Sequence, residues 1–358
     1  MSNSEMLLVE PSATSPAKRM LGTLLRSREI AVAAVLVAVI ALTTVKSTGF
    51  VFSSDGWRNL LVSPSLLLIL AVGQAVVIIT RNVDLSVGST LGLTAYLAGK
   101  VFITWPQMPV ILVFVIALAF GGLLGLVNGA LVAYGRVPSM VITLGTLYIY
   151  RGVFLSWAGS DRVNASDFPS GFNKLGTGSI LTIPIVTIIA LVVMAVVGYY
   201  LRTARGGREL YAIGSDPEAA KLYGLPVIRR VLVAFVLSGA LAGLAGVVYA
   251  ARYGTVSSGA GYGLELQAVG AAVIGGVGTV WGAALGAFLL ITINSALPLV
   301  GISDFWQRAV VGALIIAAIV LDRVLANRQE RRLVAARDAA RRESGALGNA
   351  SQKAGTPA

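Results

Sequence analysis

Long apolar runs alternate with short polar connections along this chain of 358 residues. A helix needs about 20 mainly apolar residues to cross a hydrocarbon core about 30 Å thick. Six runs meet or approach that length with few or no charges, at residues 30–45, 60–80, 108–134, 180–201, 231–251 and 309–321. A soluble domain has nothing with which to cover such runs. The pattern therefore predicts an all-α, polytopic membrane protein.

Weaker apolar segments raise the expected number of transmembrane helices to about ten, in one bundle with re-entrant or broken helices. We expect spans at residues 29–46, 60–79, 85–104, 108–134, 138–157, 180–201, 230–251, 264–280, 282–300 and 305–322. Gly, Ser and polar residues interrupt the second, third, eighth and ninth spans. A polar N-terminal segment, residues 1–28, and a basic tail, residues 323–358, flank the membrane domain, residues 29–322.

Composition agrees with this pattern and excludes several kinds of chemistry. The chain is 56% hydrophobic and 12% charged, with a mean hydropathy of +0.83, whereas soluble domains carry about 25% charged residues. It contains no Cys and no His, which excludes disulfides, thiol nucleophiles and zinc sites of the Cys/His type. We expect no catalytic residue, no metal site and no cofactor.

The placement of the charges predicts the topology. An even number of spans puts both termini on one side of the membrane. If that side is the cytoplasm, about 20 of the 28 Lys and Arg residues lie inside, as the positive-inside rule requires. The net charge of +12 is therefore a topology signal. It is not a nucleic-acid surface, because no basic face interleaved with aromatic residues occurs.

Residues 80–89, with the sequence TRNVDLSVGS, form a polar interruption between two apolar runs. Ionisable residues at membrane depth usually face protein or a water-filled path. The Asp84 carboxylate is placed to cap the next helix, whose free N–H groups and dipole favour a negative charge. Two roles are open for Asn82, Asp84 and Ser86: a gate on the inner side of the pathway, or a capping turn at the cytoplasmic interface.

The long basic loop, residues 202–230, is the largest polar segment between spans. Asp216 and Pro217 are typical of an N-cap and a first helical residue, Glu218 suits the first turn, and Gly224 ends the short helix. A helix this short is marginal alone in water. It therefore needs a partner surface, which is another protein, its own bundle or the lipid interface.

Two further segments contain candidates for the solute pathway. Residues 138–152 contain hydroxyl groups, aromatic rings and one Arg, which suit a path for polyhydroxylated solutes. Thr143, Gly145 and Arg151 are the candidates there. For the tyrosines, an interfacial aromatic belt is the competing interpretation. Residues 252–267 are rich in Gly and predict a broken or re-entrant helix lining a cavity. Glu265 and Gln267 are the candidates there, and a plain N-terminal acid is the alternative for Glu265.

Glycines repeat every fourth residue in two spans, a spacing that lets helix backbones approach closely in a membrane. The predicted packing residues are Gly121, Gly125 and Gly129 in one span, and Gly278, Gly282 and Gly286 in another. They indicate a compact bundle.

Four segments, in order along the chain, resemble permeases of bacterial ABC importers of the ribose/monosaccharide family, including ribose, rhamnose and autoinducer-2 types. They are TRNVDLSVGS at 80–89, TLGTLYIYRG at 143–152, GRELYAIGSDPEAAKLYGLP at 207–226 and GLELQAVGAAVIGGVGTVWG at 263–282. The resemblance covers roughly residues 28–323. It implies that loop 202–230 couples to an ATPase, with Gly214, Ala219, Ala220 and Gly224 at the positions of the family's docking motif. Gly207, Asp216 and Glu218 are the other predicted residues of this coupling loop.

The resemblance further implies the partners: an ABC ATPase subunit, an extracytoplasmic sugar-binding protein and a second, like or related permease. The chain has no G-x-x-x-x-G-K-[ST] segment, so the energy must come from a partner or a gradient. We expect a multi-pass protein of the bacterial cytoplasmic membrane, embedded in the lipid bilayer with both termini inside, that imports a small sugar. A gradient-driven carrier or channel, an ABC permease for branched-chain amino acids and a membrane enzyme are the alternatives.

Overall fold

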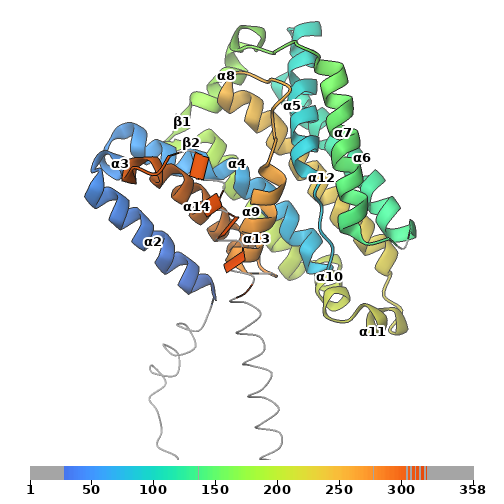
Figure 1. Ribbon diagram of the computed structural model, residues 1–358. Coiled ribbons are helices and arrows are strands. Elements are labelled where there is room, and N and C mark those ends of the chain that lie inside the picture. The colour runs from blue at the N-terminus through green and yellow to red at the C-terminus, as the bar shows by residue number, and fades with distance from the viewer. Residues whose placement is uncertain are drawn as a thin grey trace, which may run out of the picture. The chain divides into compact units, whose positions relative to one another are not determined.

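The computed structural model describes residues 28–320 except 136, 277, 304, 307, 308, 311, 314, 315, 318 and 319. The chain divides into two compact units, residues 1–307 and 308–358. The described residues of the second unit are helical. The predicted N-terminal segment apart from Arg28, the basic tail and half of the predicted tenth span lie outside the described residues. Figure 1 labels helices and strands of the first unit.

Seven described helices are long and apolar enough to cross a membrane. They are α2 (Arg28–Lys46), α4 (Ser54–Ile79), α6 (Val110–Gly135), α7 (Ser139–Ala158), α9 (Ile185–Thr203), α12 (Val227–Tyr253) and α14 (Val280–Ala296). Each corresponds to one of the ten predicted spans. The prediction of an all-α polytopic membrane protein is confirmed.

Two other predicted spans are helices of a different kind. The third span is α5 (Val87–Thr104), whose 18 residues include Gly, Ser, Thr and Lys and are almost all buried. The eighth span is wrong as a full crossing, because α13 (Leu264–Gly275) has only 12 residues. At 1.5 Å per residue such a helix is about 18 Å long, well short of a hydrocarbon core of about 30 Å. Glycines bound α13 at both ends, which fits the predicted broken helix.

The predicted sixth span starts five residues too early. Its first residues form a hairpin of two strands, β1 (Ser179–Ile180) and β2 (Ile183–Pro184), with Ser179 opposite Pro184 and Ile180 opposite Ile183. Leu181 and Thr182 between the strands have positive φ angles of 49° and 73°. Because this backbone cannot continue a helix, α9 begins only after Pro184.

Short elements complete the first unit at its two ends. These are α3 (Gly49–Phe52), η1 (Ala165–Asp167), α8 (Ser170–Thr177), α10 (Arg205–Ser215), α11 (Pro217–Leu222) and η2 (Pro298–Val300). In Figure 1, α8 lies at the upper end of the unit and α10 and α11 lie at the lower end. Since α9 and α12 are the spans on either side of α10 and α11, these two short helices lie on one side of the membrane.

Helix α12 is the centre of the packing and contacts α6, α5 and α4. Its contact with α6 is a close approach of two backbones. A Cβ atom on Gly121 or Gly125 would lie within 3.0 Å of the Gly239 or Phe235 carbonyl oxygen of α12. The space between these helices is therefore filled by main-chain atoms, as small residues allow in membrane proteins.

The second predicted glycine stripe is correct in two of its three positions. Gly282 and Gly286 of α14 lie against the backbone of α13 at Gly275 and Ala271. Gly278 does not belong to this contact. It lies in the break between α13 and α14 with a φ of 112°, and the described atom nearest to a Cβ built there belongs to Tyr211. Because the chain is not helical between α13 and α14, a spacing of four residues does not place Gly278 on the same helix face as Gly282. Gly275 of α13 makes the close contact with Gly282 that was expected of Gly278.

Candidate functional site

A buried polar cluster lies where the turn between α4 and α5 meets three other helices. The Asp84 cluster, as we name it, consists of Gln74 from α4, Asp84 and Ser86 from the turn, Asn128 from α6, Tyr150 from α7 and Ser238 from α12. Each of these side chains is at most 6% exposed. The cluster therefore links residues that lie far apart along the chain and are surrounded by protein.

The Asp84 carboxylate accepts hydrogen bonds on both of its oxygens. Oδ1 accepts from the Ser86 amide at 3.0 Å, the Ser86 hydroxyl at 2.7 Å and Asn128 Nδ2 at 3.4 Å. Oδ2 accepts from the Ser238 hydroxyl at 3.1 Å. No ion pair with Asp84 is found among the described Lys and Arg residues. Neutral donors alone therefore compensate the removal of this carboxylate from water.

The main chain of the same turn is held by side chains from α4 and α7. The Gln74 amide donates to the Asp84 carbonyl, and the Asp84 N–H donates to Gln74 Oε1 at 3.4 Å. The Val83 N–H donates to the Ser139 hydroxyl at 3.1 Å, and Thr143 Oγ1 donates to the Val83 carbonyl at 3.1 Å. Backbone at membrane depth needs such partners, because no water is present to replace them.

Two outer members complete the cluster. Asn128 Nδ2 donates to the Ser86 hydroxyl at 2.7 Å. The Tyr150 hydroxyl donates to the Leu124 carbonyl at 2.9 Å and lies 3.4 Å from Asn128 Oδ1. Tyr150 is therefore a buried member of the cluster and does not belong to an interfacial aromatic belt. Tyr148, on the opposite side of α7, is 68% exposed and suits that belt.

The structure separates the pathway candidates into buried and accessible residues. Asp84, Ser86 and Thr143 are at most 1% exposed and make internal hydrogen bonds. Asn82 is half-buried and donates to the Thr80 carbonyl and hydroxyl at 2.9 and 3.0 Å. Gly145 is exposed, and a Cβ atom placed on it would have no described atom within 4 Å. That any of them lines a solute path remains a prediction.

The predicted capping of α5 by Asp84 is not seen. Ser86 is the residue at the cap of α5, and its side chain makes no capping hydrogen bond. The Asp84 carboxylate accepts the N–H and the hydroxyl of Ser86, which lies before the helix, and no N–H group of the first turn of α5 is bonded to it among the described residues. The same carboxylate also reaches Asn128 and Ser238. The turn at Asp84 and Ser86 is therefore buried inside the bundle and not at its surface.

The Gly-rich segment before α13 enters the bundle, where Arg151 of α7 holds it. Arg151 Nη1 donates to the carbonyls of Ala260 at 2.7 Å and Ser258 at 3.4 Å. Its guanidinium also lies 5.9 Å from the centroid of the Tyr262 ring. The intramembrane Arg thus finds backbone and aromatic partners, as such a residue must.

Glu265 lies in the first turn of α13, as the alternative interpretation of the sequence had it. Its Oε1 accepts from the Gly263 N–H at 3.2 Å, whereas Oε2 is buried against Gly88 of α5 without a hydrogen-bond partner among the described residues. Gln267, two residues further on, is half-buried. The contact with Gly88 puts the Glu265 side chain near the start of α5. A role of Glu265 or Gln267 in binding solute stays a prediction.

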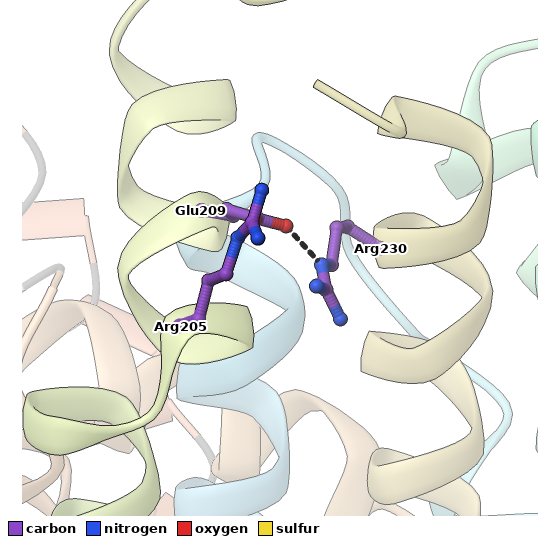
Figure 2. Close-up of polar contacts among 3 residues, drawn as sticks. All are labelled: Arg205, Glu209 and Arg230. Atoms are coloured by element: carbon purple, nitrogen blue, oxygen red, sulfur yellow. Dashed lines mark hydrogen bonds and ion pairs between the residues drawn. The ribbon is translucent and has the colours of Figure 1, made fainter. Parts of the chain in front are cut away.

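On the side of α11, an ion-pair group fastens α10 to α12. Figure 2 shows Glu209 of α10 between Arg205 of the same helix, at 2.8 Å, and Arg230 of α12, at 2.5 Å. Below this pair, Leu210 and Ile213 are completely buried. Helix α10 is therefore an integral part of the bundle on this side and not a detached loop.

The Glu209 group predicts a loss of stability in acid. Its hydrogen bond from Arg230, aided by Arg205, lowers the pKa of the Glu209 carboxyl. A carboxyl with a lowered folded-state pKa stabilises the fold above its unfolded pKa, about 4.3, and the contribution disappears as pH falls through the folded value. The melting temperature of wild type should therefore fall more steeply below about pH 4.3 than that of Glu209→Gln. Parallel curves for the two proteins would contradict this.

Helix α11 follows α10 directly and has the predicted cap. Asp216 Oδ1 accepts from the N–H groups of Glu218 at 3.0 Å and Ala219 at 3.1 Å, with Pro217 at the first helical position. Gly224, after the helix, has a φ of 73° and donates to the Lys221 carbonyl. The helix boundaries predicted from the sequence are therefore confirmed.

The seven predicted coupling residues do not form one outer surface. Gly207 packs against the end of α9, and Gly214 lies against the Ile79 carbonyl of α4. Ala220 is buried and Ala219 is half-buried, whereas Asp216, Glu218 and Gly224 are exposed. The large apolar side chains that α11 and its end expose are Leu222 and Tyr223, at 89% and 85%. Neither residue was among the predicted coupling residues.

Comparison with known proteins places the chain in a family. Residues 57–319 match the family described as branched-chain amino acid transport system / permease component. The chain belongs to this permease family. It is 35% identical over 306 residues to the autoinducer 2 import system permease protein of Enterobacter sp. (strain 638), which covers 84% of this chain and 88% of that protein.

Two other relatives agree with this membership. The autoinducer 2 import system permease protein of Shigella flexneri is 36% identical over 277 residues, with coverage of 76% of this chain and 80% of that protein. The galactose/methyl galactoside import permease protein of Salmonella typhimurium is 34% identical over 287 residues, with coverage of 74% and 85%. No solved structure matches the chain. The resemblance to sugar-type import permeases, drawn from four motifs, is confirmed.

Proposed function

We propose that this chain is the membrane-spanning permease subunit of an ATP-driven importer of a small sugar or sugar-like solute. Helix α11 binds a separate ATPase subunit, whose cycle of ATP binding and hydrolysis drives the opening of the bundle. The permease carries out no covalent chemistry. Import relatives for autoinducer 2 and for galactose or methyl galactoside support a polyhydroxylated solute; a branched-chain amino acid is the other candidate.

The observation that carries this proposal is the exposure of Leu222, the last residue of the six-residue helix α11, and of Tyr223 directly after it. Exposed large apolar side chains outside the spanning helices indicate a binding surface for another protein. Aromatic residues of this kind are the usual anchors of such surfaces. The rigid attachment of α10 to α12 through Glu209 gives this surface a fixed base in the membrane.

The proposal includes the rest of the assembly. An extracytoplasmic binding protein delivers the solute to the side opposite α11, and a second permease, identical or related, completes the pathway. Loop 202–230 lies in the cytoplasm with both termini, because this orientation puts most Lys and Arg residues inside. The assembly lies in the cytoplasmic membrane of a bacterium.

Co-purification tests the ATPase interface directly. A tagged copy is isolated from its native membrane in mild detergent, and the proteins that accompany it are identified by mass spectrometry. We expect a stoichiometric ATPase with wild type and at least about a tenfold loss with Leu222→Asp or Tyr223→Asp, because a buried interface anchor contributes about 2 kcal/mol or more. Both side chains are exposed, so the bundle should fold normally.

Leu181→Asp is the matched control. Leu181 is 90% exposed, and it lies in the β1–β2 hairpin that precedes α9, at the end opposite α11. It should retain the ATPase. If wild type brings no ATPase with it, the proposed function is wrong and a gradient-driven carrier takes its place. If an ATPase is present and survives both α11 variants, the docking surface lies elsewhere.

A further inference from the structure

Arg81 fastens the end of α10 to the turn that contains Asp84. Its Nε donates to the Gly214 carbonyl and its Nη2 to the Ser215 carbonyl, each at 2.5 Å. These carbonyls belong to the last residues of α10, which have no partner within their own helix. A guanidinium is well suited to them, since it offers two N–H groups and complements the negative end of the helix dipole.

The two segments also approach each other through their main chains. A Cβ atom on Gly214 would lie within 3.0 Å of the Ile79 carbonyl oxygen at the end of α4. Arg81 itself has a φ of 62°, a left-handed conformation that is uncommon outside Gly and is kept only where surrounding contacts hold it. Arg81 is therefore held in a definite position between α10 and the turn.

A second contact joins α10 to the other break in the bundle. The Tyr211 hydroxyl donates to the Gly278 carbonyl at 2.6 Å, in the break between α13 and α14. Helix α10 therefore contacts two points at which the described backbone is not helical, residues 80–86 and residues 276, 278 and 279. In many transporters broken helices form the solute site, around which one part of the bundle moves against the other.

Chain connectivity makes these contacts a route from α11 into the bundle. Ser215, which Arg81 binds, is followed directly by Asp216, the residue that caps α11. Arg81 is separated from Asp84 by only two residues. A displacement of α11 therefore reaches the Asp84 cluster through one side chain and three residues of backbone.

We propose that Arg81 is the positioning residue that transmits movement of α11 to the Asp84 cluster, with Tyr211 making the parallel connection to the α13–α14 break. This inference rests on the proposed function, because it needs an ATPase that moves α11. It adds that α10 connects α11 to the bundle. The contacts of α10 with Arg81 and with Gly278 are then required for ATP hydrolysis to change the conformation of the bundle. A purely local fastening of the α10 C-terminus is the competing explanation.

A labelling experiment separates the two explanations without knowledge of the solute. The chain has no Cys, so Val83→Cys gives a single reporter between Arg81 and Asp84. The complex of permease and ATPase is placed in nanodiscs, and the rate of maleimide labelling is measured with and without ATP and magnesium. We expect ATP to change this rate in the wild-type background. Arg81→Gln should reduce the ATP-dependent change about three- to tenfold while ATP hydrolysis continues.

Arg58→Gln is the matched control. Arg58 Nη2 also donates to carbonyls at the end of a short helix, Thr177 of α8 at 2.7 Å, but it has no contact with α10. Tyr211→Phe removes one hydroxyl and little else, so it tests the second connection with little risk to folding. It should weaken the response of a Thr279→Cys reporter, at the exposed position next to Gly278, in the same way.

The outcomes are distinct. An unchanged ATP response in Arg81→Gln overturns the inference while leaving the proposed function intact, and so does an equal loss in Arg58→Gln. A wild-type complex that lacks ATP hydrolysis points instead to failure of the proposed function. Loss of the response in Arg81→Gln, with hydrolysis retained and Arg58→Gln normal, supports transmission, because a merely local fastening would not alter the response to ATP.

Discussion

Replacing Gly125 with Leu is expected to prevent most of the protein from reaching its folded state. Even the Cβ of the new side chain would overlap the Phe235 carbonyl of α12, and a backbone oxygen cannot move aside as a flexible side chain can. Overpacking of a core costs about 1–3 kcal/mol where side chains adjust, so we expect at least about 3 kcal/mol here. Thermal unfolding of purified protein and the yield of monodisperse protein from membranes measure the effect.

Gly198→Leu is the control for this experiment. Gly198 lies within α9, another spanning helix, and a Cβ atom there would meet no atom within 4 Å. The same substitution should therefore change stability by less than about 0.5 kcal/mol, as for an uncrowded surface position. Gly125→Ala should lie between the two. Equal stability of Gly125→Leu and Gly198→Leu would show that α6 and α12 do not approach as described.

The long apolar helices were predictable because their signal is local. Length and lack of charge suffice for a crossing such as α6, and the four-residue spacing of its glycines lies within one helix. The break at Gly278 shows the limit of this reasoning. A spacing of four residues was counted across it, yet positive φ angles at Gly276 and Gly278 interrupt the helix, and the sequence does not specify them.

The Asp84 cluster could be predicted only in part. Asp84 and Ser86 stand together in one polar segment, so the turn was evident. Gln74, Asn128 and Ser238 are single polar residues within apolar helices, and only the folded bundle brings them to the same carboxylate. Each of these residues stands alone in an apolar stretch, and a strongly polar side chain inside a spanning helix is costly unless it finds a partner. The sequence therefore indicates that these residues have buried partners, but it does not indicate which residues the partners are.

The contacts of α10 with the rest of the bundle could not be predicted from the sequence either. The cap of α11 depends on neighbours along the chain, and its boundaries could be predicted. The bonds from Arg81 to Gly214 and Ser215 join residues more than 130 positions apart. Arg81 lies in the polar segment 80–89, but nothing local in the sequence specifies that its guanidinium binds a distant helix end. Long-range polar contacts of this kind decide how a coupling segment connects to a bundle.

Removing the Asp84 carboxylate is expected to give the second large loss of stability. In Asp84→Ala, the hydroxyls of Ser86 and Ser238 lose their acceptor inside the bundle, where no water replaces it. Each buried polar group left unpaired costs about 1–3 kcal/mol, so we expect a loss of about 3 kcal/mol in total. Denaturation of the purified protein and its folded yield measure this. Asp55→Ala, which removes an exposed carboxylate in the first turn of α4, is the control and should remain close to wild type.

Asp84→Asn separates the structural role of the cluster from a role in transport. An Asn oxygen still accepts from Ser86, and its amide can donate to the Ser238 hydroxyl, so most of the stability should return. Uptake is then measured per folded molecule in proteoliposomes that contain the whole importer. We expect uptake to fall well below wild type, because one acceptor oxygen of the carboxylate becomes a donor amide, which reverses the contact of the turn with Ser238 of α12. Wild-type uptake by folded Asp84→Asn would leave the cluster with a purely structural role, and wild-type stability of Asp84→Ala would contradict the hydrogen bonding itself.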